Sequence, residues 1–250
     1  MRPDDMGAEA VKGAIERVPG LKPEMVDDVL VGCAIPEAHQ GMILGRAIAQ
    51  KADLPDTVSG VTVNRYCASG LQAIAMGTQA VVTGQADVMV AGGAESMSLV
   101  PMTGFYSVPN PGMLQKDPDL YINMGNTAEN LVEKYGISRE DQDAFALRSH
   151  QRALDAIQSG RFNEEVVPLT IRETVYSDGQ TDSTEKVFKV DEGPRADTNL
   201  EALARLRPVF RAGGSVTAGN SSQMSDGAAA TVVMRKETAE ELGVKPMARL

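Results

Sequence analysis

The sequence predicts an α/β fold: a doubly wound, mostly parallel sheet with helices on both faces and an inserted α+β segment. Three observations support this prediction. Short apolar runs alternate with segments of helical period over roughly the first hundred residues. The alternation then stops at a stretch rich in proline, glycine and methionine, and a core-like strand returns near residue 227. Repeated strand–helix alternation is typical of parallel sheets covered by helices.

The first part of the chain contains most elements of this sheet. Apolar residues at helical spacing predict a helix over 5–18, which the Pro19-Gly20 pair ends. The expected elements that follow are a short helical turn and strand within 25–33, a helix over 41–51, a strand over 58–64, a helix over 69–83 and a strand over 87–92. The helix over 69–83 is apolar on nearly every side, which predicts that it is buried between layers.

The pattern changes after Ser98, since residues 99–122 show little periodicity. The elements expected beyond them are a helix over 127–135, a long helix from the N-cap Ser138 to about 159, strands within 161–190 around a turn at 177–180, and a short helix over 198–206. A segment punctuated by glycine, 215–222, then precedes a core strand over 227–234. Residues from about 100 to 214 are therefore expected to form an insertion in one α/β domain.

Composition excludes several classes of protein. The net charge of −10 argues against nucleic acid or an anionic membrane as the main partner. The two cysteines form no cluster with the two histidines, so neither a disulfide framework nor a metal site is expected. No run reaches the roughly 18 apolar residues of a membrane span, and a cytoplasmic location is the default expectation.

Positive charge gathers in residues 194–214, where it would suit an anionic ligand. The arginines of this segment are Arg195, Arg205, Arg207 and Arg211. An ordinary solvated face is the alternative interpretation, because a run of charges usually faces water.

The most informative stretch is 61–74, where a β-run leads through a turn carrying Cys67 into an apolar helix. Unpaired N–H groups and the helix dipole favour a thiolate at a helix N-terminus. A thiolate is a nucleophile, so the pattern indicates covalent catalysis. From these residues alone a small buried hydrophobic cysteine is the alternative. Cys33 ends an apolar run and is interpreted as a packed thiol at a strand end.

Several further segments share their order and spacing with one known family. Together with 61–74 they are 92–98, 124–130, 142–146, 207–210 and 217–230. The set resembles the thiolases, which make and cleave 3-oxoacyl-CoA and include 3-ketoacyl-CoA thiolases and other acetyl-CoA acyltransferases. The resemblance covers almost the whole chain.

The resemblance implies that Cys67 attacks an acyl-CoA and becomes the acyl-enzyme, its own backbone N–H donating to the thioester oxyanion. The other candidate residues would contact coenzyme A or its acyl group: Ser222 and Ala218 along the pantetheine arm, Arg195 and Phe210 at the nucleotide end, and Met124 at the acyl pocket. Acyl-CoA, acetyl-CoA and CoA would be substrates, with no metal and no permanently bound cofactor.

The resemblance also implies a place for this chain in a larger, five-layer fold. Residues 1–99 would be an N-terminal α/β domain without its first strand, 100–214 a CoA-binding loop domain, 215–243 the return to the first domain, and 244–250 the start of a second α/β half. The missing strand is central in the family's sheet, so its neighbours would close the gap or leave backbone groups unpaired. The chain is therefore interpreted as a thiolase truncated at both ends, which would be inactive alone. A natural half-protein that pairs with a separately encoded C-terminal partner is the alternative.

Several questions stay open at this level. Asn123 stands before Met124, where enzymes specialised for acetoacetyl-CoA carry histidine, so the sequence leans towards a 3-ketoacyl-CoA thiolase of β-oxidation rather than an acetyl-CoA acetyltransferase. A non-catalytic binder of CoA or acyl-lipid on the same scaffold and a related 3-oxoacyl synthase are alternatives. The full-length family implies a homodimer or homotetramer. Acyl chain length and physiological direction are not determined.

Overall fold

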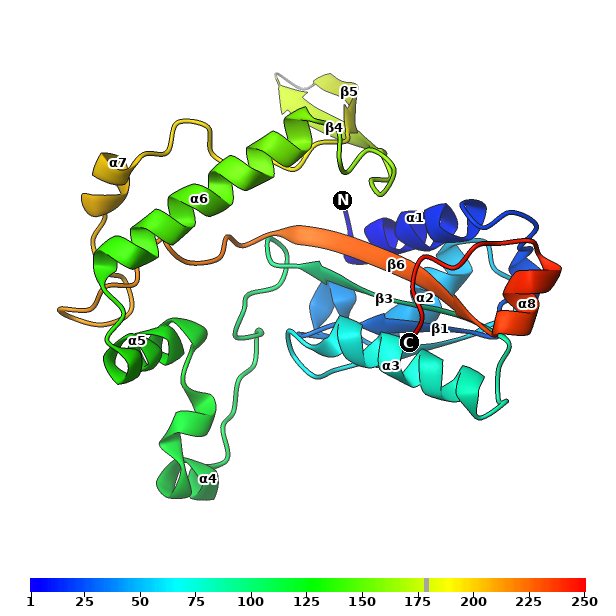
Figure 1. Ribbon diagram of the computed structural model, residues 1–250, viewed down its shortest axis with the longest axis horizontal. Coiled ribbons are helices and arrows are strands. Elements are labelled where there is room, and N and C mark those ends of the chain that lie inside the picture. Colours follow the sequence, from blue (N-terminus) through cyan, green and yellow to red (C-terminus); the bar gives the residue numbers. More distant parts are fainter. Residues whose placement is uncertain (178–179) are drawn as a thin grey trace. The chain divides into compact units, whose positions relative to one another are not determined.

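The computed structural model describes residues 1–177 and 180–250, and its chain divides into two compact units. The first unit comprises Met1–Tyr106, Val167–Phe188 and Ser225–Leu250. The second comprises Ser107–Val166 and Lys189–Met224. Figure 1 labels most of the helices and strands of both. No helix within the described ranges has the length and apolar character needed to cross a bilayer.

A four-stranded sheet forms the centre of the first unit. Its strands are β1 (Asp28–Gly32), β2 (Ser59–Val63), β3 (Val88–Ser96) and β6 (Asp226–Met234), in the order β2-β1-β3-β6. β1 runs parallel to both β2 and β3, and β6 runs antiparallel to β3. The predicted α/β class is thus confirmed, with an antiparallel strand at one edge.

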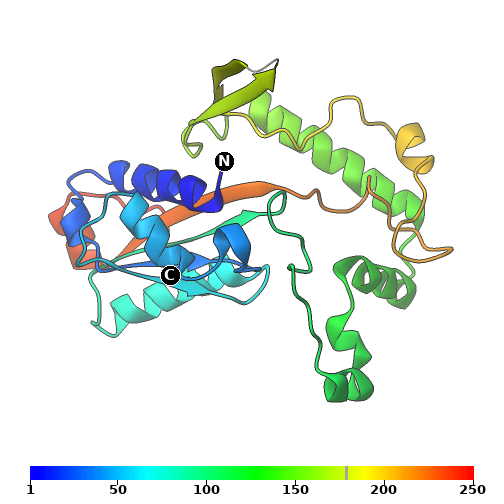
Figure 2. The same ribbon diagram turned by 180° about the vertical axis from the view of Figure 1, so that it is seen from behind.

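Helices cover both faces of this sheet, as predicted. α1 (Pro3–Glu16) and α2 (Leu44–Lys51) lie on one face and α3 (Ser69–Val82) on the other (Figures 1 and 2). Because successive side chains of a strand point to opposite faces of the sheet, the buried strand residues form two clusters, one on each face. The cluster beneath α1 and α2 includes Val29, Val31, Val88 and Val90, and the cluster beneath α3 includes Leu30, Met89 and Ala91.

The α3 helix is less buried than its apolar sequence predicted. Ala73 and Gly77 face the sheet and are buried. Leu71 and Val82, in contrast, are 72% and 77% exposed. Among the described residues the helix therefore packs by one side only, and they do not form the second layer that its apolar sequence predicts.

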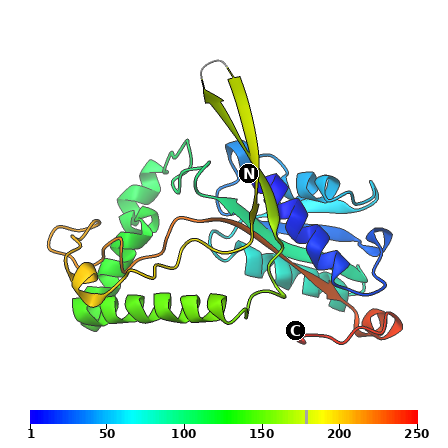
Figure 3. The ribbon, with the colours of Figure 1, turned by 90° about the horizontal axis from the view of Figure 1, so that it is seen from above.

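Shorter elements complete the first unit. They are the 3-10 turns η1 (Pro23–Met25) and η2 (Ala38–Gln40), the hairpin strands β4 (Leu169–Ser177) and β5 (Gln180–Phe188), and α8 (Lys236–Glu241). β4 and β5 pair in antiparallel register and form the hairpin visible in Figure 3. The central residues of the predicted turn, 178–179, lie outside the described residues.

The second unit is helical. Its elements are α4 (Pro111–Lys116), η3 (Pro118–Tyr121), α5 (Met124–Tyr135), α6 (Arg139–Gln158) and α7 (Leu200–Ala204). Ser138 caps α6 as predicted, because its Oγ accepts a hydrogen bond from the Asp141 N–H at 3.1 Å. The stretch that shows little periodicity, 99–122, contains α4, which Asn110 caps by accepting from the Met113 N–H at 3.1 Å. The pair Asn110-Pro111 is the start signal that periodicity alone missed.

Hydrogen bonds to the Asp226 carboxylate link the start of β6 to the end of β3. Its carboxylate accepts hydrogen bonds from the Ser98 N–H and the Ser96 hydroxyl, both at 2.9 Å, and from the Ser98 hydroxyl. Burial opposes ionisation of Asp226, but the hydrogen bonds from Ser98 and Ser96 outweigh it and hold its pKa below the ordinary value. A carboxylate of lowered folded pKa stabilises the protein above its unfolded pKa, and that contribution disappears as the pH falls through the folded value.

Asp226→Asn is expected to lower the free energy of unfolding at pH 7 by about 1 kcal/mol, a figure reduced because the residue is exposed and solvent-screened. The difference from wild type should shrink as the pH falls below about 4 and through the lowered folded pKa of Asp226, because the wild-type carboxyl group then becomes neutral as well. Urea denaturation at pH 7 and pH 3 measures it. Asp56→Asn is the control, since that side chain is 97% exposed and its nearest ion-pair contact is 3.7 Å. A pH-independent loss for Asp226→Asn would contradict this account.

Candidate functional site

Cys67 lies in the turn that joins β2 to α3. It is exposed and forms no disulfide. Ala68 is the N-cap of α3 and Ser69 its first residue, so Cys67 stands just before the helix rather than at its first turn. The helix thus begins at Ser69, as predicted, and Cys67 directly precedes its N-cap.

The turn around Cys67 has an unusual backbone. Tyr66 adopts a left-handed conformation with φ of 46°, which a bulky side chain seldom takes. The Tyr66 N–H donates to Asn64 Oδ1 at 2.9 Å. Ser69 Oγ accepts from the Arg65 N–H at 2.8 Å and donates to the Tyr66 carbonyl. These bonds hold the strained residue in place and present Cys67 at a defined position at the carboxyl edge of the sheet.

Ser69 is 3% exposed, so water cannot easily replace its hydroxyl as the hydrogen-bond partner of Arg65 and Tyr66. Ser69→Ala is expected to lower the free energy of unfolding by about 1–3 kcal/mol, because buried donors and acceptors are left unsatisfied. Ser159→Ala, which removes a single 3.2 Å bond from an exposed helix end, should cost about 0.5 kcal/mol or less. Chemical denaturation of both variants measures the effect. Equal losses would show that Ser69 does not hold the turn.

The second thiol has a different environment. Cys33 is 1% exposed, which confirms the interpretation of a packed thiol after the first strand. Burial raises its pKa to about 12, and the carboxylate of Glu95 adds to the effect. That carboxylate also accepts hydrogen bonds from the Ala34 N–H at 2.6 Å and from Gln40 Nε2. At neutral pH Cys33 is thus a protonated core group, while Cys67 is open to reagents.

The remaining candidate residues belong to the second unit, whereas Cys67 belongs to the first. Met124 begins α5 and is 62% exposed. Phe210 is 40% exposed, and its ring lies so close to Gly125 that a Cβ on that glycine would overlap it. The structure therefore brings Phe210 together with the start of α5, next to Met124.

The other predicted residues lie on exposed loops. Ala218 and Ser222 are exposed, and Ser222 Oγ donates to the Gln223 carbonyl at 3.2 Å. Arg195 forms an ion pair with Asp197 at 3.1 Å, and its side chain is 66% exposed. The guanidinium proposed for the nucleotide end of CoA thus already has an intramolecular partner, as a solvated charged face predicts.

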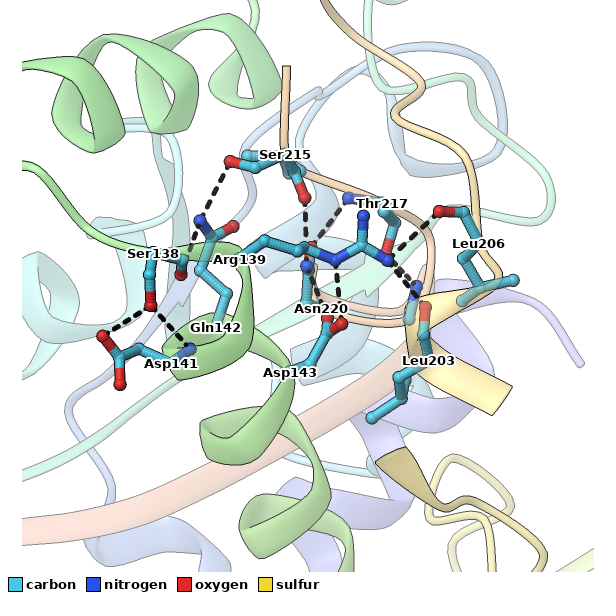
Figure 4. A network of polar contacts seen from close by, with 12 residues as sticks. Ser138, Arg139, Asp141, Gln142, Asp143, Leu203, Leu206, Ser215, Thr217 and Asn220 are labelled. Atoms are coloured by element: carbon cyan, nitrogen blue, oxygen red, sulfur yellow. Dashed lines mark hydrogen bonds and ion pairs between the residues drawn. The ribbon is translucent and has the colours of Figure 1, made fainter. Parts of the chain in front are cut away.

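Sequence reasoning assigned no role to several residues that organise these regions. Around Cys67 they are Asn64 and Ser69, and in the second unit they are Glu129, Asp143 and Asn220. The contacts of Asp143 and Asn220 are part of the polar network in Figure 4. The spacing of Arg139 and Asp143 by four residues was the available signal for one of these contacts.

A helix-flanked mixed sheet with an exposed cysteine in the turn between β2 and α3 defines the class: an α/β protein that presents a thiol at the carboxyl edge of its strands. Comparison with protein families is more specific. Residues 1–237 match the model described as "Thiolase, N-terminal domain", and the chain belongs to the thiolase family. The family resemblance and the fold expected from it are both confirmed.

Individual relatives agree with this assignment. The chain is 48% identical over 250 residues to the 3-ketoacyl-CoA thiolase of Bacillus subtilis (strain 168), covering 100% of this chain and 64% of that protein. It is 42% identical over 258 residues to an acetyl-CoA acetyltransferase of Allochromatium vinosum, covering 98% and 63%. The crystal structure of the Bacillus anthracis acetyl-CoA acetyltransferase matches with a TM-score of 0.83 at 40% identity, over 98% of this chain and 63% of that one. The chain thus spans slightly less than two thirds of the length of these relatives.

Proposed function

We propose that this chain carries the acyl-accepting cysteine and the CoA-binding unit of a thiolase-type acyltransferase. The observation that carries the proposal is the exposed Cys67 on its hydrogen-bonded, left-handed turn. Its thiolate would attack the carbonyl carbon of an acyl-CoA, the C–S bond to CoA would break, and CoA would leave as a thiolate that takes up a proton. The product is a thioester on Cys67.

In the complete reaction with a 3-oxoacyl-CoA, the bond between the carbons α and β to the thioester would break. Acetyl-CoA would leave as an enolate that needs a proton, and a CoA thiol would then release the acyl group from Cys67. The two histidines, His39 and His150, lie in different units, and His150 Nδ1 already accepts the Arg195 N–H at 3.1 Å. The resemblance places the acid and base in the family's second half, so little turnover is expected from these residues alone.

The second unit would supply CoA binding through Ser222, Ala218, Arg195, Phe210 and Met124. Asn123 before Met124 favours cleavage of 3-oxoacyl-CoA of broader chain length over acetoacetyl-CoA alone, and the names of the relatives include both activities. A cytoplasmic location belongs to the proposal, because both cysteines are free. The proposal also includes self-association of the full-length protein and a second α/β half that completes the five layers.

Incubation of the chain with acetyl-CoA tests the proposal, with intact mass and peptide mapping as readouts. We expect an acetyl adduct on Cys67 that hydroxylamine removes, and release of one CoA for each adduct. Acetoacetyl-CoA and a long-chain 3-oxoacyl-CoA compared as donors then test the acyl preference. Binding of CoA by calorimetry without any adduct would favour the non-catalytic binder, and neither binding nor adduct would contradict the proposal.

A further inference from the structure

We infer that two buried carboxylates, those of Glu129 and Asp143, are positioning residues that hold the segment 215–222 in the shape in which it meets CoA. The inference rests on the proposed function, since that segment carries Ala218 and Ser222. Both carboxylates lie in the second unit, on α5 and α6, and neither has a role in the chemistry proposed for Cys67.

Glu129 binds the beginning of the segment. Its side chain is 2% exposed, and its Oε1 accepts hydrogen bonds from the Ser215 N–H at 3.0 Å and the Val216 N–H at 2.8 Å. A Cβ on Gly214 would overlap the carboxylate, so the backbone lies directly against it. Among the ion pairs of the described residues none involves Glu129. Backbone amides therefore satisfy this carboxylate, and moving the segment would leave it buried without partners.

Asp143 binds the end of the same segment. It is 4% exposed, and its Oδ1 accepts from Asn220 Nδ2 at 2.9 Å (Figure 4). Its Oδ2 accepts from Arg139 Nε at 2.8 Å, and Arg139 Nη2 donates onward to the Leu203 carbonyl at 2.6 Å. Asp143 thus joins the segment to α6 and, through Arg139, to the residues of α7.

The segment also satisfies its own polar groups. Asn220 Oδ1 accepts from the Thr217 N–H at 2.7 Å, and Asn220 Nδ2 donates to the Ser215 carbonyl at 3.1 Å. Gln142 Nε2 donates to Ser215 Oγ at 2.9 Å. Thr217 is fully buried, and its carbonyl accepts from the Ser221 hydroxyl at 2.7 Å. A loop whose backbone is fixed before a ligand arrives loses little conformational entropy on binding.

Placement of a loop explains these charges better than stability does. Buried ionic groups seldom increase stability over apolar residues of similar size, whereas they specify one arrangement strongly. The carboxylates face the side of the segment towards α5 and α6, and Ala218 and Ser222 are exposed. The network therefore positions Ala218 and Ser222, while its two carboxylates would not contact the ligand themselves.

Asp143→Asn tests the inference in the 250-residue chain. An amide at position 143 must direct a donor towards either Arg139 Nε or Asn220 Nδ2, and turning the Asn220 amide only moves the conflict to the Thr217 N–H. Adding Asn220→Asp gives the new amide an acceptor again but removes the donor to the Ser215 carbonyl, so the double variant should recover part of the loss. Asp141→Asn is the matched control, because Asp141 lies on the same helix but is exposed and bonded only near the cap.

Two readouts are compared: CoA affinity by calorimetry, and hydrogen exchange of the peptide amides over 215–222. For Asp143→Asn we expect about tenfold weaker CoA binding, as loss of one charge-assisted hydrogen bond would produce, together with faster exchange. The double variant should recover at least threefold in affinity, and Asp141→Asn should match wild type in both readouts. Faster exchange with unchanged affinity, or no change in exchange, would overturn the inference.

A milder variant covers the case in which Asp143→Asn does not fold. Glu129→Gln keeps the size of the side chain and an oxygen for the Val216 N–H, but it removes the charge and places an amide donor where Oε2 accepts the Ser215 N–H at 3.2 Å. We therefore expect a folded protein with about threefold weaker CoA binding and faster exchange. Unchanged exchange and affinity in that variant would overturn the inference. If wild type itself binds no CoA, the proposed function fails, and with it the ligand assigned to the segment, even where exchange shows that the network holds the loop.

Discussion

Replacing Cys67 with alanine is expected to abolish transfer of an acyl group from acetyl-CoA to this chain, by at least about 10³-fold, while the fold stays intact. The Cys67 side chain is exposed, so its removal opens no buried cavity and should change the free energy of unfolding by about 0.5 kcal/mol or less. Intact mass after incubation with acetyl-CoA, with and without hydroxylamine, measures the loss. A thioester formed at an equal rate in Cys67→Ala would refute the assignment of the nucleophile.

The matched control is Cys33→Ala, which removes the other thiol. Burial, with Glu95 nearby, raises the pKa of Cys33 to about 12, so this group stays protonated at pH 8 and should accept no acyl group. We therefore expect Cys33→Ala to be acylated as fast as wild type, although loss of a buried side chain should destabilise it by about 1–3 kcal/mol. If Cys33→Ala lost the adduct and Cys67→Ala kept it, Cys33 and not Cys67 would be the nucleophile.

Local patterns explain why the sheet and the cysteine turn were predictable. The periodicity of a strand or helix is visible within about ten residues, and β1, β2, α3 and β3 each follow such a pattern. α3 begins at Ser69 as predicted, but the shape of the turn before it was not predicted, because the Arg65 N–H donates to Ser69 Oγ and closes that turn. That bond depends on the left-handed backbone at Tyr66, a conformation that residue type does not indicate.

The polar network of the second unit could not be predicted in this way. Glu129 meets Ser215 across 86 positions of sequence, and Asp143 meets Asn220 across 77. An acidic residue in a helix ordinarily faces water, so burial of these two becomes visible only when distant loops are in place. The exposed face of α3 is the opposite case: its apolar sequence predicted contacts that this chain does not make.

Gly32→Ala is expected to be among the most damaging glycine-to-alanine substitutions in the first unit. A Cβ at this position would overlap the Ser69 carbonyl carbon and lie 2.5 Å from the Gly70 nitrogen. Gly32 pairs with Val63 on one side and Gly93 on the other, so the strand cannot easily move away. Since the obstructing atoms are backbone, no rotamer relieves the clash. We expect the free energy of unfolding to fall by about 3 kcal/mol or more.

The same substitution should impair Cys67, because the displaced residues continue directly from its turn. A shift of the nucleophile by about 1 Å commonly costs about 10²-fold in rate, so acylation of whatever protein folds should be at least tenfold slower. Gly77→Ala on α3 is the matched control: its Cβ would lie 3.4 Å from Met89 Cβ, an ordinary contact, and alanine favours the helix by about 0.5–1 kcal/mol. Urea denaturation should therefore show a lower free energy of unfolding for Gly32→Ala and a slightly higher one for Gly77→Ala. Acylation should be slower in Gly32→Ala and unchanged in Gly77→Ala. A stable, reactive Gly32→Ala would mean that the start of α3 does not rest on β1, and that the Cys67 turn is held from elsewhere.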